Sequence, residues 1–472
     1  MNKIKDNTLY RFRSIDKLCG SFQELENQTI YFSPPENLND PVEGLRDIYF
    51  KGDSVLWKNL FRDYLLCLVD FALYYISIGE SEKPTDVFVK LLNERDFHGN
   101  MQPVWSEISN SFFDDKNVSS LIENIIKYRV SVTQVELTCY LTLVHHTALD
   151  LIFKSFKSAG IINVDVMEEV TSNLADKMGK DFFEALNESH EKLDSRLVDE
   201  VFIRHQSFFK QCYLALEHNR GMHGRNAKLL HNEFPFEYIN RIEQLMYPKW
   251  FTACFMSCAT NSSVWGNYGN NHTGVCLIFN ADFNESIGHH LKFNNVIVGH
   301  GMNGPILGSG AFKFYEIRYT NKLNSLNFFE SLGCLPIPLF NSQWLVDRDG
   351  NKSGYAVSFD EEWRQKYWDD FYLSITQKSE DWRYENEHRL LINNMSGSYA
   401  SDGITLNYDF KSLKGIIFGI KTSDEDKLKI INIVKSKVIE NEHYDFKLYQ
   451  AHYCRHTGEI KHTELSLFHF KK

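Results

Sequence analysis

The chain has 472 residues, and its 62 acidic residues outnumber its 51 lysines and arginines, which gives a formal net charge of −11. Hydrophobic residues make up 43% and charged residues 24%, so a disordered or collagen-like chain is excluded. The negative charge excludes binding of nucleic acid by charge alone and leaves only a local basic groove for that purpose.

The cysteines and the apolar stretches favour a cytoplasmic protein. The nine cysteines are scattered, and no pair has the C-x-x-C spacing, so we expect reduced thiols. No apolar run follows the basic residues near position 1, so no signal peptide is predicted. The most apolar stretch, residues 64–78, contains Asp70 and is too short to span a bilayer, which favours a buried helix.

Residues 1–50 are predicted to form strands and turns, as the first part of an α+β core. Residues 8–13 (TLYRFR) alternate, and residues 28–33 (QTIYFS) are rich in β-forming side chains. The triplet NDP at 39–41 favours a turn. Residues 51–247 differ, because apolar residues recur there at spacings of three and four, which predicts a helical insertion of six to eight helices.

Residues 248–472 return to a β pattern and are predicted to complete the core. The strands expected there are WFTACFMSC, TGVCLIFN, WRYENEHRLLI, LKGIIFGI and KLYQAHYC, with helices at 361–378 and in SDEDKLKIINIVKSK. The expected fold class is therefore α+β, with a mixed or antiparallel β core that is interrupted by a large all-α insertion.

Arg11 and Arg13 form the first candidate constellation. On a strand both guanidinium groups point to the same side, and two such groups make a clamp for a pyrophosphate or a carboxylate. The alternative is an edge strand with a solvated, charged face.

The second constellation is the polar loop between two apolar strands, which follows Ser257 and contains Trp265, Tyr268, His272 and Gly274. Two aromatic rings, a histidine and several Ser and Asn side chains fit a pocket that stacks a planar ring and hydrogen-bonds its edge. The alternative is a loop that inserts one tryptophan into the core.

The third constellation is WRYENEHRLLI. As a strand it would place Arg383, Glu385, Glu387 and Arg389 on one face, with the two carboxylates side by side. Such a pair can divide the work of stabilising positive charge and taking a proton. The alternative is a solvated strand face with ion pairs across strands.

Motifs for metals and for nucleotide phosphates give little support. The run HYCRH offers His452, Cys454 and His456 at period two, which is a weak ligand signal, and we predict no metal site. The sequence has no P-loop, no G-x-G-x-x-G after a strand, and no G-x-S-x-G elbow.

Five ordered motifs resemble a widespread bacterial family of unknown function. They are LYRFRS, IYFSPPENLNDPVEG, SCATNSSVWGNYGNNHTGVCLIF, DWRYENEHRLL and LKGIIFGIKTSDEDKLK, within residues 8–50 and 248–455. The helical block near 55–245 resembles an enlarged insertion.

The order of the motifs is also similar, more remotely, to the ADP-ribosyltransferase fold of the Arg-Ser-Glu type. This resemblance implies that Arg11 or Arg13 holds the phosphates of NAD and that Ser257 braces the strand on the nicotinamide side. It further implies that Trp265 or Tyr268 stacks on the nicotinamide. His272 has no fixed role in that scheme.

The same resemblance implies that Glu387 bonds the ribose and stabilises an oxocarbenium ion, while Glu385 activates the acceptor. The first hypothesis is therefore an NAD-consuming enzyme, an ADP-ribosyltransferase or NAD glycohydrolase, acting as a toxin or antiphage effector. It requires Arg13, Tyr268 and Glu387 to line the same cleft. The acceptor is an unidentified protein or nucleic acid, and the helical insertion is expected to bind a partner or to oligomerise.

The second hypothesis is a non-catalytic sensor in a defence system, which binds a nucleotide or a protein and in which the two glutamates pair with arginines structurally. The third is a nucleic-acid-processing enzyme that uses carboxylates with Mg²⁺. It needs a third acidic ligand near Glu385, which the sequence does not nominate.

Overall fold

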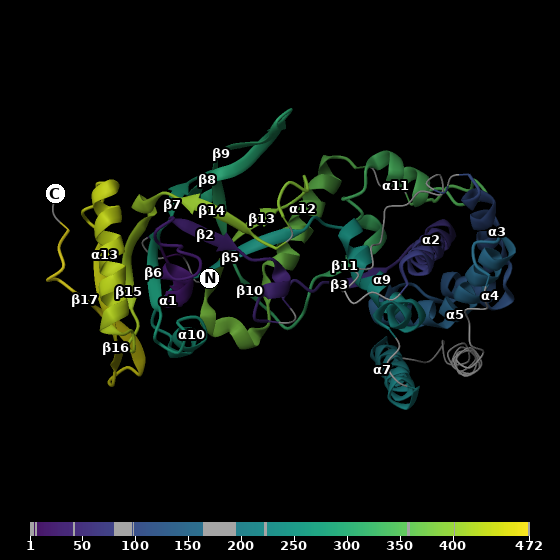
Figure 1. Cartoon of the computed structure of the whole chain (residues 1–472), viewed down its shortest axis with the longest axis horizontal. Helices are drawn as coiled ribbons and strands as arrows, with labels where there is room; N and C mark the ends of the chain where they lie inside the picture. Colours follow the sequence, from purple (N-terminus) through teal and green to yellow (C-terminus); the bar gives the residue numbers. More distant parts are fainter. Residues whose placement is uncertain are drawn as a thin grey trace. The chain divides into compact units, whose positions relative to one another are not determined.

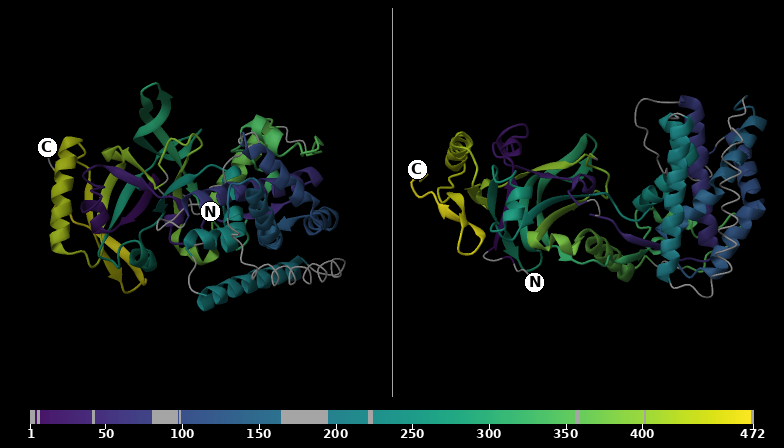
Figure 2. Two further views of the ribbon diagram at one scale, coloured as in Figure 1. Left: turned by 45° about the vertical axis from the view of Figure 1, so that its right-hand side comes forward. Right: turned by 90° about the horizontal axis from the view of Figure 1, so that it is seen from below.

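Contacts divide the chain into two compact units, which Figures 1 and 2 colour along the sequence. The sheet unit comprises Met1–Arg46, Pro248–Asn324 and Asp369–Lys472, and the helical unit comprises Asp47–Tyr247 and Ser325–Trp368. Within the described residues, every helix is too short or too polar to cross a lipid bilayer. The structure is a computed structural model and describes residues 4, 7–40, 43–79, 97, 99–163, 195–220, 224–355, 359–400 and 402–470.

One twelve-stranded mixed sheet organises the sheet unit. Its strands are β1 (Thr8–Arg13), β2 (Thr29–Phe32), β5 (Trp250–Met256), β6 (Val275–Asn280), β7 (Asp282–Asn284), β8 (Gly288–Gly301), β9 (Gly304–Glu316), β13 (Glu387–Asn393), β14 (Ile404–Tyr408), β15 (Leu413–Phe418), β16 (Lys447–Cys454) and β17 (Glu459–Glu464). They lie in the order β17-β16-β15-β6-β1-β5-β13-β9-β8-β14-β2, with β7 beside β8. A β-bridge between Ser33 and Thr252 brings the end of β2 next to β5, so the sheet curls back on itself.

The remaining elements of the sheet unit are short, apart from one long helix. That helix, α13 (Asp424–Glu440), connects β15 to β16, which run parallel as such a crossover requires. Ser423 caps its first turn, where three acidic residues complement the helix dipole. The others include α1 (Ile15–Cys19), α10 (Ser262–Asn267) and the parallel pair β10 (Arg318–Tyr319) and β12 (Gln377–Lys378).

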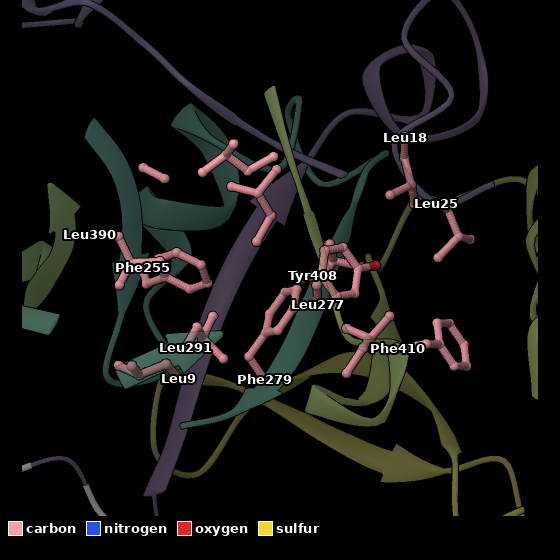
Figure 3. Close-up of a cluster of buried hydrophobic side chains, with 14 of the residues drawn as sticks. Leu9, Leu18, Leu25, Phe255, Leu277, Phe279, Leu291, Leu390, Tyr408 and Phe410 are labelled. Atoms are coloured by element: carbon pink, nitrogen blue, oxygen red, sulfur yellow. The ribbon is translucent and has the colours of Figure 1, made fainter. Parts of the chain in front are cut away.

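The two faces of the sheet carry different cores, because alternate side chains of each strand point to opposite sides. Leu9 of β1 shares the larger core with Phe255, Phe279 and Leu390, which Figure 3 shows converging between the strands. Phe12 instead belongs to the smaller core on the opposite face, with Met256, Trp265 and Cys276. The register of the strands therefore decides which functional side chains meet.

Long amphipathic helices dominate the helical unit. They are α2 (Ser54–Ile78), α3 (Met101–Asp114), α4 (Lys116–Tyr128), α5 (Gln134–Ser158) and α7 (Ser195–Arg220). Shorter helical segments are α8 (Arg225–Lys228), α9 (Phe234–Ile242), α11 (Ile337–Gln343) and the part of α12 (Glu361–Ile375) that precedes Asp369. A small sheet joins β3 (Asp47–Phe50) to β4 (Val132–Thr133) and β11 (Ser325–Asn327). The predicted α+β class with a mixed sheet and several helices is confirmed.

Candidate functional site

The WRYENEHR segment is not a continuous strand, and that prediction is wrong in its first half. Glu380–Glu385 forms a 3-10 helix, and β13 begins only at Glu387. Between them Asn386 adopts a left-handed conformation with φ of 47°, which asparagine tolerates better than most residues. Arg383 is therefore not on a shared strand face, and it pairs with Glu380 at the exposed surface.

Glu385 and Glu387 nevertheless reach the same place, because both bind Lys378 of β12. The Lys378 Nζ donates to Glu385 Oε2 at 2.8 Å and to Glu387 Oε2 at 3.1 Å. The same Nζ lies 3.9 Å from a carboxylate oxygen of Glu43. Lys378 thus holds three carboxylates together. Glu385 and Glu387 are close to it in sequence, whereas Glu43 is 335 positions away.

Arg389 is the second cation of this group. Its Nε donates to Glu387 Oε1 at 2.7 Å and a terminal nitrogen donates to Glu387 Oε2 at 3.2 Å, which is a bidentate pair. Its other terminal nitrogen donates to the carbonyl of Ile375 at 3.0 Å, and the guanidinium also pairs with Glu43. We call Glu43, Lys378, Glu385, Glu387 and Arg389 the carboxylate cluster.

The carboxylate cluster is sealed and carries an excess of negative charge. Its side chains are 0–2% exposed, and three carboxylates face two cations, a formal balance of −1. Burial raises the pKa of Glu387, which Lys378 opposes and Glu385 reinforces. Burial acts to lower the pKa of Lys378, but the acidic neighbours outweigh it and raise the pKa above its usual range. The formal charge of −1 therefore favours an added proton or a positive charge nearby.

Tyr268 covers one side of the carboxylate cluster. Its hydroxyl donates to Glu385 Oε1 at 2.6 Å and accepts from Asn39 Nδ2 at 2.8 Å. Burial and the neighbouring Glu385 raise the pKa of Tyr268, although Lys378 opposes this, so the hydroxyl stays protonated and acts as a donor. Tyr268 is half-buried and Asn39 is exposed, so these two residues connect the sealed cluster to the surface.

Two further aromatic rings lie beside the cluster. Trp382 and Tyr384 have ring centroids 6.1 Å apart, and Lys378 Nζ lies 4.7 Å from the centroid of the Trp382 ring. The hydroxyl of Tyr384 accepts from Asn267 Nδ2 at 3.2 Å. Both rings are half-buried, so part of each is available to a planar ligand.

The other loop residues have mainly structural surroundings. Trp265 is fully buried against Phe12, and its Nε1 donates to the carbonyl of Ala259 at 2.8 Å, which fits the alternative of a tryptophan inserted into the core. The His272 ring is stacked on Trp265, with centroids 6.4 Å apart. Ser257 follows β5, and its backbone N–H donates to the carbonyl of Asn386 at 3.0 Å.

Arg11 and Arg13 lie on the other face of the sheet. Tyr10 and Glu387 both align with Met256, so the side chains of Tyr10 and Glu387 share a face, and the odd-numbered residues of β1 point away from it. Arg11 donates to the carbonyls of Cys254 and Tyr31, both at 3.1 Å. The structure does not bring these arginines to the carboxylate cluster.

Internal partners already occupy both arginines. Arg13 Nε donates to Glu24 Oε2 at 2.6 Å, in a pair that is largely buried. Arg11 is buried, and its guanidinium lies over the ring of Phe255 at 5.3 Å. Burial lowers the pKa of Arg11 to about 10, with the charge of Arg13 acting in the same direction.

The metal prediction concerns the end of β16. His452 and Cys454 lie on that strand, whereas His456 lies in the turn beyond it. Across the part of the chain that the structure describes, no group of three or more His, Cys, Asp or Glu side chains is arranged to hold a metal ion.

Sequence reasoning missed Lys378, Glu43 and Asn39. Lys378 comes from a two-residue strand after a helix, and Glu43 from a loop far away in sequence, so neither shows a periodic signal. Asn39 belongs to the NDP turn that the sequence does indicate, but nothing in that motif points to Tyr268.

Comparison with known proteins identifies one family. Residues 264–390 match the model of a family described as "Protein of unknown function (DUF2971)". The matched segment includes Tyr268, Lys378, Glu385 and Glu387, and it begins after Arg13. No curated protein and no solved structure matches the chain. Residues 264–390 are therefore similar to a family of unknown function, as the resemblance predicts.

Proposed function

We propose that the carboxylate cluster and Tyr268 form an active site that cleaves the nicotinamide–ribose bond of NAD, as an ADP-ribosyltransferase or NAD glycohydrolase does. The observation that carries this proposal is the pair of glutamates bridged by Lys378, of which Glu385 also accepts a hydrogen bond from the Tyr268 hydroxyl. Such an activity would make the protein a toxin or an antiphage effector.

The electrostatics of the cluster suit this reaction. The nicotinamide ring of NAD is cationic, and the ribose becomes an oxocarbenium-like cation as its C1′–N bond breaks and the bonding electrons leave with nicotinamide. A cluster with an excess of one negative charge favours both species. Glu387 would stabilise the sugar cation, and Glu385 would accept the proton of the water or acceptor that adds at C1′.

The placement of the basic residues removes one part of the expected site, because Arg13 does not line one cleft with Tyr268 and Glu387. Arg11 and Arg13 lie on the opposite face and have internal partners, so we assign them no part in holding the phosphates of NAD. Substrate must also displace Tyr268 and Asn39, because they cover the carboxylates. The adjacent half-buried rings of Trp382 and Tyr384 remain as stacking partners.

A specific observation also favours a second candidate, a non-catalytic sensor that binds a nucleotide or a protein segment. The side chains of Glu385 and Glu387 are 0% and 1% exposed, and each oxygen of Glu387 has a cationic partner. A carboxylate with these partners orders the core without taking part in chemistry.

Nicotinamide release from NAD, with and without cell extract as a source of acceptors, separates the two candidates. The enzyme proposal expects release by the wild type and a loss of about 100-fold or more in Glu387→Gln. Glu387→Gln should fold, because it balances two carboxylates against two cations. Glu380→Gln, in the same segment but exposed, is the matched control and should keep full activity.

No release by a folded wild type under any of these conditions would remove the enzyme proposal. Unchanged release by Glu387→Gln would remove the role of the cluster. Binding of NAD to the wild type without release, measured by calorimetry, would favour the sensor.

A further inference from the structure

The charges of the candidate site suit a cation and do not suit a phosphate. The carboxylate cluster has a formal charge of −1, and its two cations, Lys378 and Arg389, are both bound to carboxylates. Burial and the charge of Glu385 raise the pKa of Tyr384, and Lys378 is the cation that opposes this rise. Burial also raises the pKa of Tyr268, and Lys378 opposes that rise as well. The cation that acts on both tyrosines is therefore one that carboxylates already hold.

Arg383 lies between Trp382 and Tyr384 in the sequence, but it too has an acidic partner. Its Nε and a terminal nitrogen donate to the two carboxylate oxygens of Glu380, each at 2.6 Å. The two arginines of β1 lie on the other face of the sheet. A phosphate at this site would thus have to compete with a carboxylate for each of the cations described there.

The aromatic rings beside the cluster strengthen the preference for a cation. The Trp382 ring already attracts the ammonium group of Lys378, whose Nζ lies 4.7 Å from the ring centroid. Trp382 and Tyr384 are half-buried, so both keep some exposed ring surface. The faces of aromatic rings are electronegative, and the cluster carries excess negative charge. A flat cation would therefore be attracted both by the rings and by the carboxylates.

We propose that the site recognises the cationic nicotinamide riboside half of its substrate and not the phosphates, so that its preferred substrates are cationic N-ribosides without phosphate. This inference rests on the proposed function and names the substrate class of the same site. Nicotinamide riboside is a cation, whereas the two phosphates of NAD give that molecule a net negative charge. The cluster, and the net charge of −11 on the whole chain, attract the first and repel the second.

The chemical step is the same for both substrates. The C1′–N bond of the riboside breaks, and its electrons leave with neutral nicotinamide. Water adds at C1′, and Glu385 takes the proton that the water releases. The phosphates of NAD play no part in this step, so their cost to binding is not repaid in the transition state.

Nicotinamide release by the full chain from nicotinamide riboside, nicotinamide mononucleotide and NAD tests the proposal. The value of kcat/KM should fall in that order, with at least about a fivefold difference between the first and the last in dilute buffer. The difference should shrink when NaCl is raised to about 0.5 M, because salt screens the interaction between charges. Faster cleavage of NAD than of nicotinamide riboside would overturn this proposal and leave the proposed function standing.

A variant of Glu43 tests whether the charge of the cluster causes the preference. Glu43 pairs with Arg389 and is assigned no catalytic role, and Glu43→Gln makes the formal charge of the cluster zero. The preference for nicotinamide riboside over NAD should fall by at least about twofold. The matched control is Glu425→Gln in the exposed first turn of α13, which changes the net charge of the chain equally and should leave the preference unchanged. A preference that Glu43→Gln does not alter would overturn the proposal.

Calorimetry with 1-methylnicotinamide gives a readout that does not depend on catalysis. This pyridinium cation has no ribose to lose, and it should bind at least about tenfold more tightly than neutral nicotinamide. Trp382→Leu should weaken the binding of the cation more than that of the neutral ring. Equal binding of the two rings to the wild type would overturn the proposal. No release from any of the three substrates would remove the proposed function and this proposal with it.

Discussion

Replacing Arg389 by methionine is the sharpest perturbation of the carboxylate cluster. Methionine keeps much of the length of the side chain and removes the guanidinium. Glu387 then loses its bidentate partner, Glu43 loses its paired cation, and the carbonyl of Ile375 loses a donor. Three buried carboxylates would face Lys378 alone.

The loss of stability caused by Arg389→Met can be estimated in two ways. Breaking a buried ion pair from one side costs about 3–5 kcal/mol. A carboxylate that has lost its partner can instead take up a proton. Because pH 7 lies 2.5 pH units above the usual pKa of 4.5, this protonation costs about 3.4 kcal/mol. We therefore expect Arg389→Met to destabilise the sheet unit by about 3–4 kcal/mol at pH 7.

The same argument fixes the pH dependence. A carboxyl whose pKa in the folded state is raised contributes stability below its unfolded pKa and loses it as the pH rises through the folded pKa. Burial already raises the pKa of Glu387, and loss of Arg389 raises it further. The penalty of Arg389→Met should thus be smaller at pH 5 than at pH 7.

Hydrogen exchange of peptides from β13, followed at increasing urea concentration, measures the stability of this unit separately from the helical one. Arg383→Met is the control, because it removes an arginine from an exposed pair with Glu380 in the preceding turn. Equal effects of the two variants, or a penalty for Arg389→Met that does not fall toward pH 5, would refute the reasoning. The double variant Arg389→Met/Glu387→Gln should recover part of the loss.

Two more predictions concern backbone packing and a partly buried acid, Asp63. Gly274→Ala should cost about 3 kcal/mol in thermal unfolding, because its Cβ would lie 2.4 Å from the carbonyl oxygen of Arg13, while Gly266→Ala, with open space around it, should be tolerated. Burial raises the pKa of Asp63 from 3.8 to about 6, so the helical unit loses stability as the pH rises through that range. Asp63→Asn keeps an acceptor for the Tyr238 hydroxyl and should remove this slope, with a gain of up to about 3 kcal/mol at pH 7; a slope that persists would contradict it.

Local patterns in the sequence predict where most strands lie. They do not predict which side chains of different strands share a face of the sheet. Alternation is enough to place Arg11 and Arg13 on one side of β1, and the structure has them there. Whether that side is also the side of Glu387 depends on how β1, β5 and β13 align. A shift by one residue would reverse the answer, and no local feature of the sequence encodes it.

The prediction for Glu385 and Glu387 fails for a different reason. The alternating letters of WRYENEHR suit a strand, but a left-handed Asn386 breaks the period, so Glu385 reaches Lys378 from a turn and Glu387 from β13. Asparagine in such a run is the one signal that could have warned of a break. The glycine of the polar loop, Gly274, has a clear structural reason, because it packs against the backbone of Arg13 in β1.

A double-mutant cycle decides whether the two sheet faces act separately. Arg13 and Glu387 lie on strands two places apart, about 10 Å by strand spacing, and point to opposite sides. Arg13→Ala should destabilise the protein, because it strands the buried Glu24, but its effect and that of Glu387→Gln should add to within about 0.5 kcal/mol.

The reference cycle combines Glu387→Gln with Lys378→Met, because the native Glu387 and Lys378 side chains are in contact. Their effects on the free energy of unfolding should be coupled by about 1–3 kcal/mol. A comparable coupling between Arg13 and Glu387 would mean that the first strand and the carboxylate cluster form one site after all. Additivity would instead confine any chemistry to the face of Tyr268, where the only described cations in the cluster, Lys378 and Arg389, are already bound to carboxylates. A substrate with phosphates would then have to bring its cationic end to this face and leave its phosphates outside the cluster.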